Sequence, residues 1–303
     1  APLIGEEEIA EVVACLRSGW IGTGPRVAQF ERDFAAAKNL PHVAAVNSCT
    51  AALHLSLLAA GLEPGDEVIT TPLTFCATVN AIIHAGATPV LADVYPVTMN
   101  LDPARVAERI TPRTRALVPV HFAGRACAME ALLALAQKHG LKVIEDCAHA
   151  IETERHGVGA GQWGDFSCFS FYATKNMTTG EGGLVAAKRE EDLAKVKRLA
   201  LHGMSKDAWK RFGDDGYKHY SVVETGFKYN MMDLQAALGL HQLRRVEENW
   251  LRRQKIWARY MEAFADLPVT LPAPVETGSR HAFHLFTALI DEQSCGMSRD
   301  QFL

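Results

Sequence analysis

Apolar residues recur along the chain at two spacings, and the two spacings alternate. Helical spacing covers residues 6–16, 26–37, 49–60, 77–85, 103–110, 129–139 and 190–201. Short runs rich in β-branched residues lie between several of these segments, namely HVAAVNS, DEVITTP, ATPVLADV, RALVPV and LKVIEDCA. Strands that are apolar almost throughout and alternate with helices are typical of a parallel sheet covered on both faces. We therefore expect an α/β fold with a mostly parallel central sheet and helices on both faces.

The later part of the chain predicts a second, smaller unit. Residues 184–187 form one further predicted strand, residues 203–224 a polar surface loop, and residues 232–265 a long helix. The run RHAFHLFTALI predicts a strand of a small domain that begins near Leu267. We expect a large domain over residues 1–235. Residues 236–303 are expected to form a connecting helix and the start of a small C-terminal α/β domain.

The stretch DFSCFSFYATKNMTTGEGG, residues 165–183, contains Lys175 in unusual surroundings. The part FSCFSF alternates small polar and aromatic residues, which predicts a strand with one buried face. The part GEGG predicts a tight turn, or a backbone that closely approaches another group. Partial burial would lower the pKa of Lys175, as a Schiff-base lysine requires. The alternative is a lysine whose amine simply reaches solvent, and this stretch alone leaves both open.

Composition narrows the class of protein. The 303 residues are 48% hydrophobic and 22% charged, which provides a core and argues against disorder. A net charge of -4 with dispersed basic residues argues against nucleic acid as a partner. No apolar run approaches the roughly 20 residues that span a bilayer, and the acidic start is not typical of a signal peptide. Seven cysteines without a CxxC pair indicate free thiols in a reducing cytoplasm rather than a zinc site.

Two polar features follow predicted strands, at the sheet edge where ligands of parallel sheets bind. The first is the segment NSCTA, residues 47–51, where a strand meets a helix. Its backbone N–H groups and hydroxyls predict a phosphate cradle, although an ordinary helix N-cap explains them too. The second is Asp146, which is expected to be a helix cap, a metal ligand or the partner of a protonated ring nitrogen. The metal interpretation is weak, because His149 nearby has no further ligand cluster.

Two more features complete the set. Phe75 follows the strand DEVIT and is expected either to stack on a planar ligand or to belong to the core. Lys175 follows Ser170 by five residues on the same segment. An amine for an aldehyde, a carboxylate for a ring nitrogen, a stacking ring and a phosphate cradle together predict pyridoxal 5'-phosphate (PLP). No GxGxxG follows the first predicted strand and no GxxxxGK[ST] occurs, so the dinucleotide and P-loop interpretations lack a fingerprint.

Seven colinear blocks resemble the DegT/DnrJ/EryC1/StrS family of PLP-dependent sugar aminotransferases, which have fold type I. The blocks are GWIGTGPRVAQFE, TAALHLSLLAAGLEPGDEVITTPLTFCATVNAI, GATPVLADV, TPRTRALVPVHFAG, IEDCAHAIET, FSFYATKNMTTGEGG and GFKYNMMDLQAALGLHQL. GFKYN and ATKN are most similar to the branch that acts on UDP-4-keto sugars, such as the 4-amino-4-deoxyarabinose enzyme. A dehydratase branch carries histidine in place of the lysine, so Lys175 favours transamination.

The resemblance implies a role for each matching residue. Lys175 matches the lysine that bonds to the cofactor aldehyde, and Asp146 matches the partner of the pyridine nitrogen. His149 matches a residue near the cofactor 3-hydroxyl, and Phe75 the aromatic residue on the ring face. The implied phosphate contacts are Thr50, Ala51 and Ser170 from one subunit, with Asn230 and Lys228 from its neighbour.

The resemblance also implies a homodimer and a reaction. The expected reaction transfers an amino group from an amino acid, glutamate, to a nucleotide-linked keto sugar. A keto-cyclitol or cyclohexenoid acceptor remains an alternative, and so does a PLP-binding regulator or an inactive partner subunit. Family members continue for several tens of residues beyond the position of Leu303. Either the sequence is a fragment, or part of the substrate-side wall is missing. His121, after the strand ALVPV, is expected to be a structural histidine.

Overall fold

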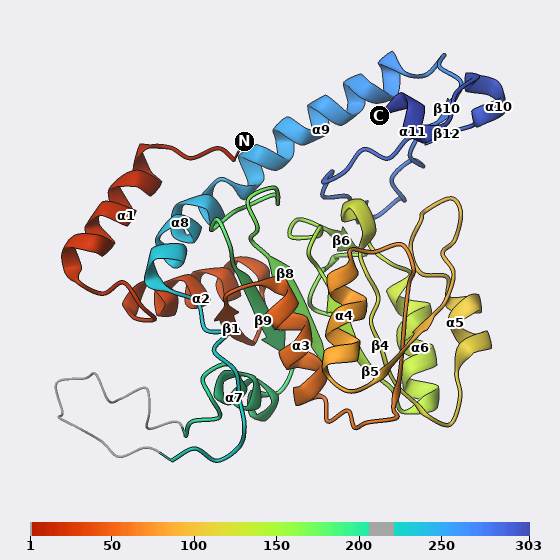
Figure 1. Ribbon diagram of the computed structural model, residues 1–303. Helices are drawn as coiled ribbons and strands as arrows, with labels where there is room; N and C mark the ends of the chain where they lie inside the picture. The colour runs from red at the N-terminus through yellow and green to blue at the C-terminus, as the bar shows by residue number, and fades with distance from the viewer. Residues whose placement is uncertain (1, 206–220) are drawn as a thin grey trace.

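The computed structural model describes residues 2–205 and 221–303 and is centred on a 7-stranded sheet (Figure 1). The strand order is β1-β9-β8-β5-β4-β2-β3. Only β9 runs antiparallel to its neighbours in this sheet, so the predicted mostly parallel sheet is confirmed. The bounds are β1 (His42–Val46), β2 (Glu67–Thr70), β3 (Thr88–Leu91), β4 (Thr114–Leu117), β5 (Lys142–Asp146), β8 (Phe166–Ser170) and β9 (Gly183–Ala187).

Helices cover both faces of the sheet, as the apolar strands predicted. Alternate strand residues enter two separate hydrophobic cores. One core is closed by α3 (Cys49–Ala59), α4 (Cys76–His84) and α7 (Glu190–Leu199). The other is closed by α2 (Pro25–Lys38), α5 (Pro103–Arg109), α6 (Met129–His139) and α8 (Asp233–Arg244). Nearly every predicted helix in this part begins and ends within two residues of its observed bounds.

Strand β8 is buried on both faces, so the prediction of one buried face is wrong. Phe166 enters the core beneath α3, while Phe169 enters the opposite core and lies 5.1 Å from the ring of Phe34. Ser167 is buried between them, and its hydroxyl donates to the carbonyl of Gly161 at 3.2 Å. The small polar residues of FSCFSF therefore fit a covered strand because they find hydrogen-bond partners inside.

The long helix predicted over residues 232–265 is two helices, α8 and α9 (Val246–Ala263). The break falls at Arg245, whose backbone has φ -99° and ψ 0°. There the Arg245 guanidinium pairs with the carboxylate of Glu8, a fully buried residue of α1 (Glu6–Ser18). Helix α1 packs along α8, while α9 extends away from it toward the C-terminal segment (Figure 1). The break thus occurs where a buried carboxylate on α1 requires a cation.

The strand predicted for residues 280–290 forms only at its two ends. Arg280 belongs to β11 (Ser279–Arg280), which pairs with β6 (Glu154–Arg155), and β6 also pairs with β7 (Val158–Gly159). At the other end, β12 (Leu289–Ile290) pairs with β10 (Val269–Thr270). Between these ends the chain bonds instead to a loop, since Ala282 N–H donates to Gly124 O at 2.8 Å.

The remaining predictions for this region have mixed outcomes. The short helices α10 (Glu292–Cys295) and α11 (Arg299–Phe302) follow the β10–β12 sheet, which is separate from the central sheet. The division into domains at residue 235 stays a prediction. Most of the predicted surface loop, residues 206–220, lies outside the described residues.

Within the described ranges, no helix combines the length and the apolar character needed to cross a bilayer.

Phe34→Ala is expected to destabilise the fold strongly. Phe34 is fully buried and its ring packs against Phe30, Phe169 and Phe171. Truncating a buried phenylalanine costs about 3–5 kcal/mol of the free energy of unfolding. Urea unfolding followed by circular dichroism should show this loss, whereas Phe302→Ala, at a residue 66% exposed, should leave the midpoint nearly unchanged. Equal midpoints for the two variants would contradict the packing described above.

Candidate active site

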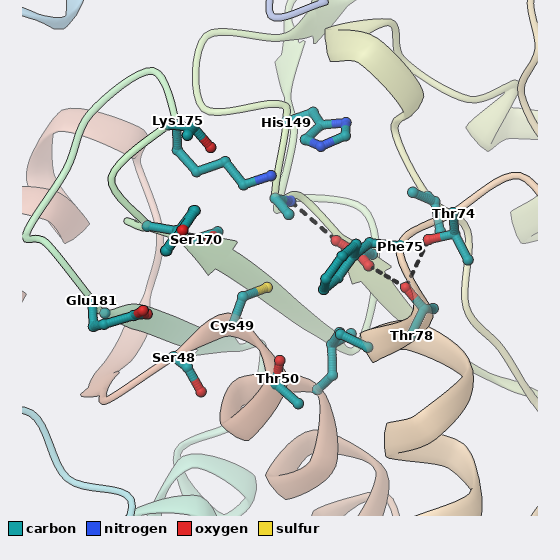
Figure 2. A pocket seen from close by; sticks show the side chains of 18 of the residues that line it. Ser48, Cys49, Thr50, Thr74, Phe75, Thr78, His149, Ser170, Lys175 and Glu181 are labelled. Atoms are coloured by element: carbon teal, nitrogen blue, oxygen red, sulfur yellow. Dashed lines mark hydrogen bonds between the residues drawn. The ribbon is translucent and has the colours of Figure 1, made fainter. Parts of the chain in front are cut away.

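A cavity of about 600 Å³ lies at the carboxyl ends of the parallel strands. Its walls come from the segments that follow β1, β2, β5 and β8, together with the turn before β9. The lining includes six residues that the sequence predicted for a cofactor site, namely Thr50, Phe75, Asp146, His149, Ser170 and Lys175. All of these except Asp146 are labelled in Figure 2. Segments far apart in the sequence thus meet at the sheet edge where ligands of α/β proteins bind.

Lys175 lies on a turn that follows β8, and its side chain extends into the cavity (Figure 2). The turn is closed by a hydrogen bond from Lys175 N–H to Tyr172 O at 2.9 Å. Burial lowers the pKa of the Lys175 amine, and the negative charges of Asp146 and the Cys49 thiolate form oppose this shift. Lys175 is only partly buried, so the alternative of an amine that reaches solvent stays open. The direction of the predicted pKa change is confirmed.

Asp146 is the last residue of β5 and is only 5% exposed. One carboxylate oxygen accepts a hydrogen bond from Thr78 Oγ1 at 2.8 Å, and the other accepts from Ala148 N–H at 3.1 Å. Burial nevertheless raises the pKa of Asp146. The bond to Ala148 closes a turn, and no helix begins there, so the helix-cap alternative is wrong. The carboxylate also faces the cavity, where a cationic group could meet it.

The sequence interpretation missed a pair of threonines behind Asp146. Thr78 Oγ1 donates its proton to Asp146, so it must accept from Thr74 Oγ1, which lies 2.8 Å away. Both hydroxyls line the cavity (Figure 2). Residues four apart share a helix face, and Thr74 and Thr78 flank the start of α4. That spacing was the signal that could have identified them.

Phe75 is 73% exposed, although it is a large apolar residue. It occupies the N-cap position of α4 and its ring stands in the cavity (Figure 2). The alternative of a core phenylalanine is therefore wrong. An aromatic ring with an open face beside a cavity can stack on a planar ligand.

The start of α3 provides part of the predicted phosphate cradle. Ser48 Oγ accepts from Ala51 N–H at 3.1 Å, so the N-cap interpretation is correct and this amide is already bonded. Ala51 is buried and does not line the cavity, whereas Thr50 and Ser170 do. The first N–H groups of a helix have no intrahelical acceptor. The amides of Cys49 and Thr50 are therefore the ones suited to an anion.

The GEGG turn brings β9 close to this helix start. A Cβ added at Gly183 would lie 2.4 Å from the carbonyl carbon of Ser48 and 2.5 Å from Cys49 N. Gly180 adopts a positive φ of 80°, which favours glycine. The sequence offered two explanations for GEGG, and each applies to a different glycine. Gly180 forms the tight turn, and Gly183 permits the close backbone approach.

His149 lies on the cavity wall near Lys175 (Figure 2). Its Nδ1 accepts a hydrogen bond from Ala123 N–H at 3.3 Å. Burial, with a smaller contribution from the Lys175 charge, lowers the pKa of His149 to about 3. The imidazole is therefore neutral at pH 7, and its Nε2 carries the proton.

Lys228 and Asn230 do not line the cavity of their own chain. Lys228 Nζ donates to Asn230 Oδ1 at 2.7 Å, and Asn230 Nδ2 donates to Thr23 Oγ1 at 2.6 Å. Their predicted contact with the phosphate of a neighbouring subunit stays a prediction.

His121, Glu145 and Cys147 form a buried group with the ligand spacing of a metal site. The two oxygens of Glu145 are already occupied, because they accept from His121 Nε2 at 2.9 Å and from the N–H groups of Gly161, Trp163 and Gly164. His121 Nδ1 accepts from Cys127 N–H at 3.1 Å. The prediction of a structural histidine at His121 is confirmed, because both of its ring nitrogens have hydrogen-bond partners in the core.

Known proteins are similar to this chain in sequence and fold. The DegT/DnrJ/EryC1/StrS aminotransferase family matches residues 2–303. The spore coat polysaccharide biosynthesis protein SpsC of Bacillus subtilis is 52% identical over 302 residues, covering 100% of this chain and 78% of the relative. The aminotransferase TlmJ of Streptoalloteichus hindustanus superposes with a TM-score of 0.91 at 33% identity, covering 99% of this chain and 79% of TlmJ.

A further structural neighbour bears on the cofactor. Spr1654 of Streptococcus pneumoniae, a proposed sugar aminotransferase, was solved in PMP and PLP forms. The PMP form superposes with a TM-score of 0.90 at 35% identity, covering 96% of this chain and 78% of Spr1654.

The cavity residues of this chain fit PLP. The amine of Lys175 has a lowered pKa and suits an aldehyde, while the buried Asp146 carboxylate suits a protonated ring nitrogen. Phe75 presents an open ring face, and the start of α3 presents unbonded amides to a phosphate. A volume of about 600 Å³ falls in the range of cofactor sites.

Thr78→Val is expected to raise the pKa of Asp146 further, because it removes a hydrogen bond that favours the charged carboxylate. A hydrogen bond to a charged group is worth about 1.5–3 kcal/mol. Carboxyl ¹³C NMR of the cofactor-free protein over a pH series measures this pKa. Thr74→Val is the matched control, since it leaves Thr78 free to donate to Asp146 and should change the pKa less. A larger effect from Thr74→Val would contradict the direction assigned to the two hydrogen bonds.

Proposed function

Because the chain belongs to the DegT/DnrJ/EryC1/StrS aminotransferase family, we propose that it transfers an amino group from L-glutamate to a nucleotide-linked keto sugar. It is a PLP-dependent aminotransferase of a family that acts on sugars. The observation that carries the proposal is the meeting of the Lys175 amine, the Asp146 carboxylate and the open Phe75 ring in one cavity. The relative SpsC, whose name refers to spore coat polysaccharide, supports a sugar destined for a cell-envelope polymer.

Lys175 is the proposed reactive residue. When bound, PLP withdraws electrons from the α-carbon of the amino donor. Burial favours the unprotonated form of the Lys175 amine. Nζ would hold the cofactor aldehyde and, once the donor amine displaced it, would act as general acid/base for proton transfer from the donor α-carbon. Proton transfer by a positioned side chain typically contributes 10²–10⁴-fold to the rate.

Asp146 and His149 are the proposed binding residues of the ring. Asp146 would keep the ring nitrogen protonated, and the hydrogen bonds from Thr78 and Ala148 hold the carboxylate in one orientation. His149 would donate from Nε2 to the 3-hydroxyl, since its Nδ1 already accepts from Ala123. Thr50 and Ser170 would contact the phosphate together with the free amides at the start of α3.

A second copy of the chain is part of the proposal. Lys228 and Asn230 lie outside the cavity of their own chain, which supports a role toward the site of the other subunit in a homodimer.

The seven cysteines all lie in the described part of the chain and are free thiols. Free thiols support a reducing compartment, the cytoplasm.

Reduction of the protein–PLP complex with borohydride tests the site. We expect visible absorption on addition of PLP, followed by a labelled peptide that contains Lys175. Lys175→Ala should keep the unfolding midpoint and lose turnover by at least 10²-fold. Labelling elsewhere, or turnover by Lys175→Ala, would contradict the role assigned to Lys175.

The substrate is tested with L-glutamate as donor and a panel of nucleotide-linked keto sugars and keto-cyclitols as acceptors. Preference for a cyclitol would overturn the sugar proposal.

The reactivity of Lys175 should extend to lower pH than that of an exposed lysine. Burial lowers its pKa, so the free amine is already populated at a pH where ordinary lysines are protonated. Competitive labelling of the cofactor-free protein with acetic anhydride, read out by peptide mass spectrometry over a pH series, measures this. Lys138, an exposed residue on α6, is the internal comparison. Identical pH profiles for both residues would refute the desolvation argument.

A further inference from the structure

A chain of contacts joins the cavity to the connecting helix α9. His149, on the cavity wall, is stacked on His284, with ring centroids 4.3 Å apart and an interplanar angle of 29°. His284 belongs to the segment between β11 and β12 and is not part of the cavity lining. His284 therefore contacts a residue of the site without lining the cavity itself.

A series of side-chain contacts that begins on α9 fixes the orientation of the His284 ring. Arg253 of α9 pairs with Glu152, which is 2% exposed, and the other Glu152 oxygen accepts from Asn176 Nδ2 at 2.6 Å. The amide of Asn176 must then present its oxygen to His284 Nδ1, which lies 2.7 Å away. An amide oxygen only accepts, so His284 Nδ1 carries a proton.

The backbone of His284 acts on the same histidine by a second route. His284 N–H donates to Ala123 O at 3.1 Å, and Ala123 N–H donates to His149 Nδ1 at 3.3 Å. Ala123 has a φ of 57°, a left-handed conformation that costs a non-glycine residue about 1–2 kcal/mol. Such a conformation persists only where surrounding contacts hold it. His284 thus contacts both the ring of His149 and the residue, Ala123, whose N–H bonds to that ring.

We propose that His284 is a positioning residue that, held by Asn176, fixes the ring of His149 so that its Nε2–H faces the cofactor. This inference rests on the proposed role of His149 beside the 3-hydroxyl. Stacking prevents rotation of the His149 ring, and the Ala123 amide selects the nitrogen that stays unprotonated. Burial lowers the pKa of His149 to about 3 and that of His284 to about 2, which keeps two stacked rings uncharged beside Lys175 and Arg253.

The arrangement also involves the reactive lysine. Asn176 follows Lys175 directly, and its side chain bonds to both Glu152 and His284. The backbone next to Lys175 and the ring of His149 are therefore held by one hydrogen-bonded group anchored on α9. Two groups on different segments of the cavity wall share a single support.

Histidine ¹⁵N NMR of the cofactor-free protein tests the positioning directly. We expect a single Nε2–H tautomer for His149, assigned by its loss in His149→Gln, and a tautomer mixture in His284→Ala. His284→Phe keeps an aromatic stack without the bond to Asn176 and should give an intermediate result. His139→Phe, at an exposed histidine on α6, is the matched control and should leave the signals unchanged. An unchanged His149 tautomer in a folded His284→Ala protein would overturn the proposal.

A double-mutant cycle on PLP affinity separates positioning from general packing. Losing one hydrogen bond to the cofactor should raise the Kd for PLP about threefold to tenfold in His284→Ala. In the His149→Gln background the same change should have little further effect, because His284 acts through His149. An equal loss in both backgrounds would indicate packing alone and overturn the proposal. Borohydride labelling of Lys175 in each variant reports the proposed function independently of this outcome.

Discussion

A carboxylate buried at the end of a parallel strand is the constraint on which the site depends. Asp146 is removed from water by the fold, and burying an uncompensated charge is costly. Its two hydrogen bonds, from Thr78 and Ala148, reduce this cost without neutralising the charge. The Lys175 charge also favours the ionised carboxylate, while its own burial lowers the pKa of Lys175. A protonated ring nitrogen bound in the cavity would supply a further cation to this carboxylate.

The gathering of the site could be predicted from the sequence because it depends on strand ends. Periodicity identifies where β5 and β8 lie, and parallel strands bring their carboxyl ends to one edge of the sheet. Asp146, Lys175 and Phe75 could thus be assigned to one place before any contact was known. Chemistry then restricts the ligand, since few cofactors need an amine, a carboxylate and a stacking ring together.

Other features could not be predicted, because they depend on contacts between distant segments. The helix break at Arg245 coincides with its pairing to a buried glutamate on α1. The backbone N–H groups of Ala282, His284 and Leu285 bond to the loop at residues 123–124 instead of to a strand. The hydrogen bond from Thr78 could be identified only from the register of α4 relative to Asp146. The amide of Ala51 fitted a phosphate cradle by sequence, yet the side chain of Ser48 occupies it. Local propensity contains none of this information.

The close approach of Gly183 to the start of α3 has a consequence for sequence comparison. A methyl group at this position would push against the backbone of Ser48 and Cys49, not against a ligand. Selection would then preserve glycine here even in a descendant that had lost the lysine at residue 175. Invariance at residue 183 would report the distance between a strand and a helix, and only variation at residue 175 would reveal whether the chemistry had been kept.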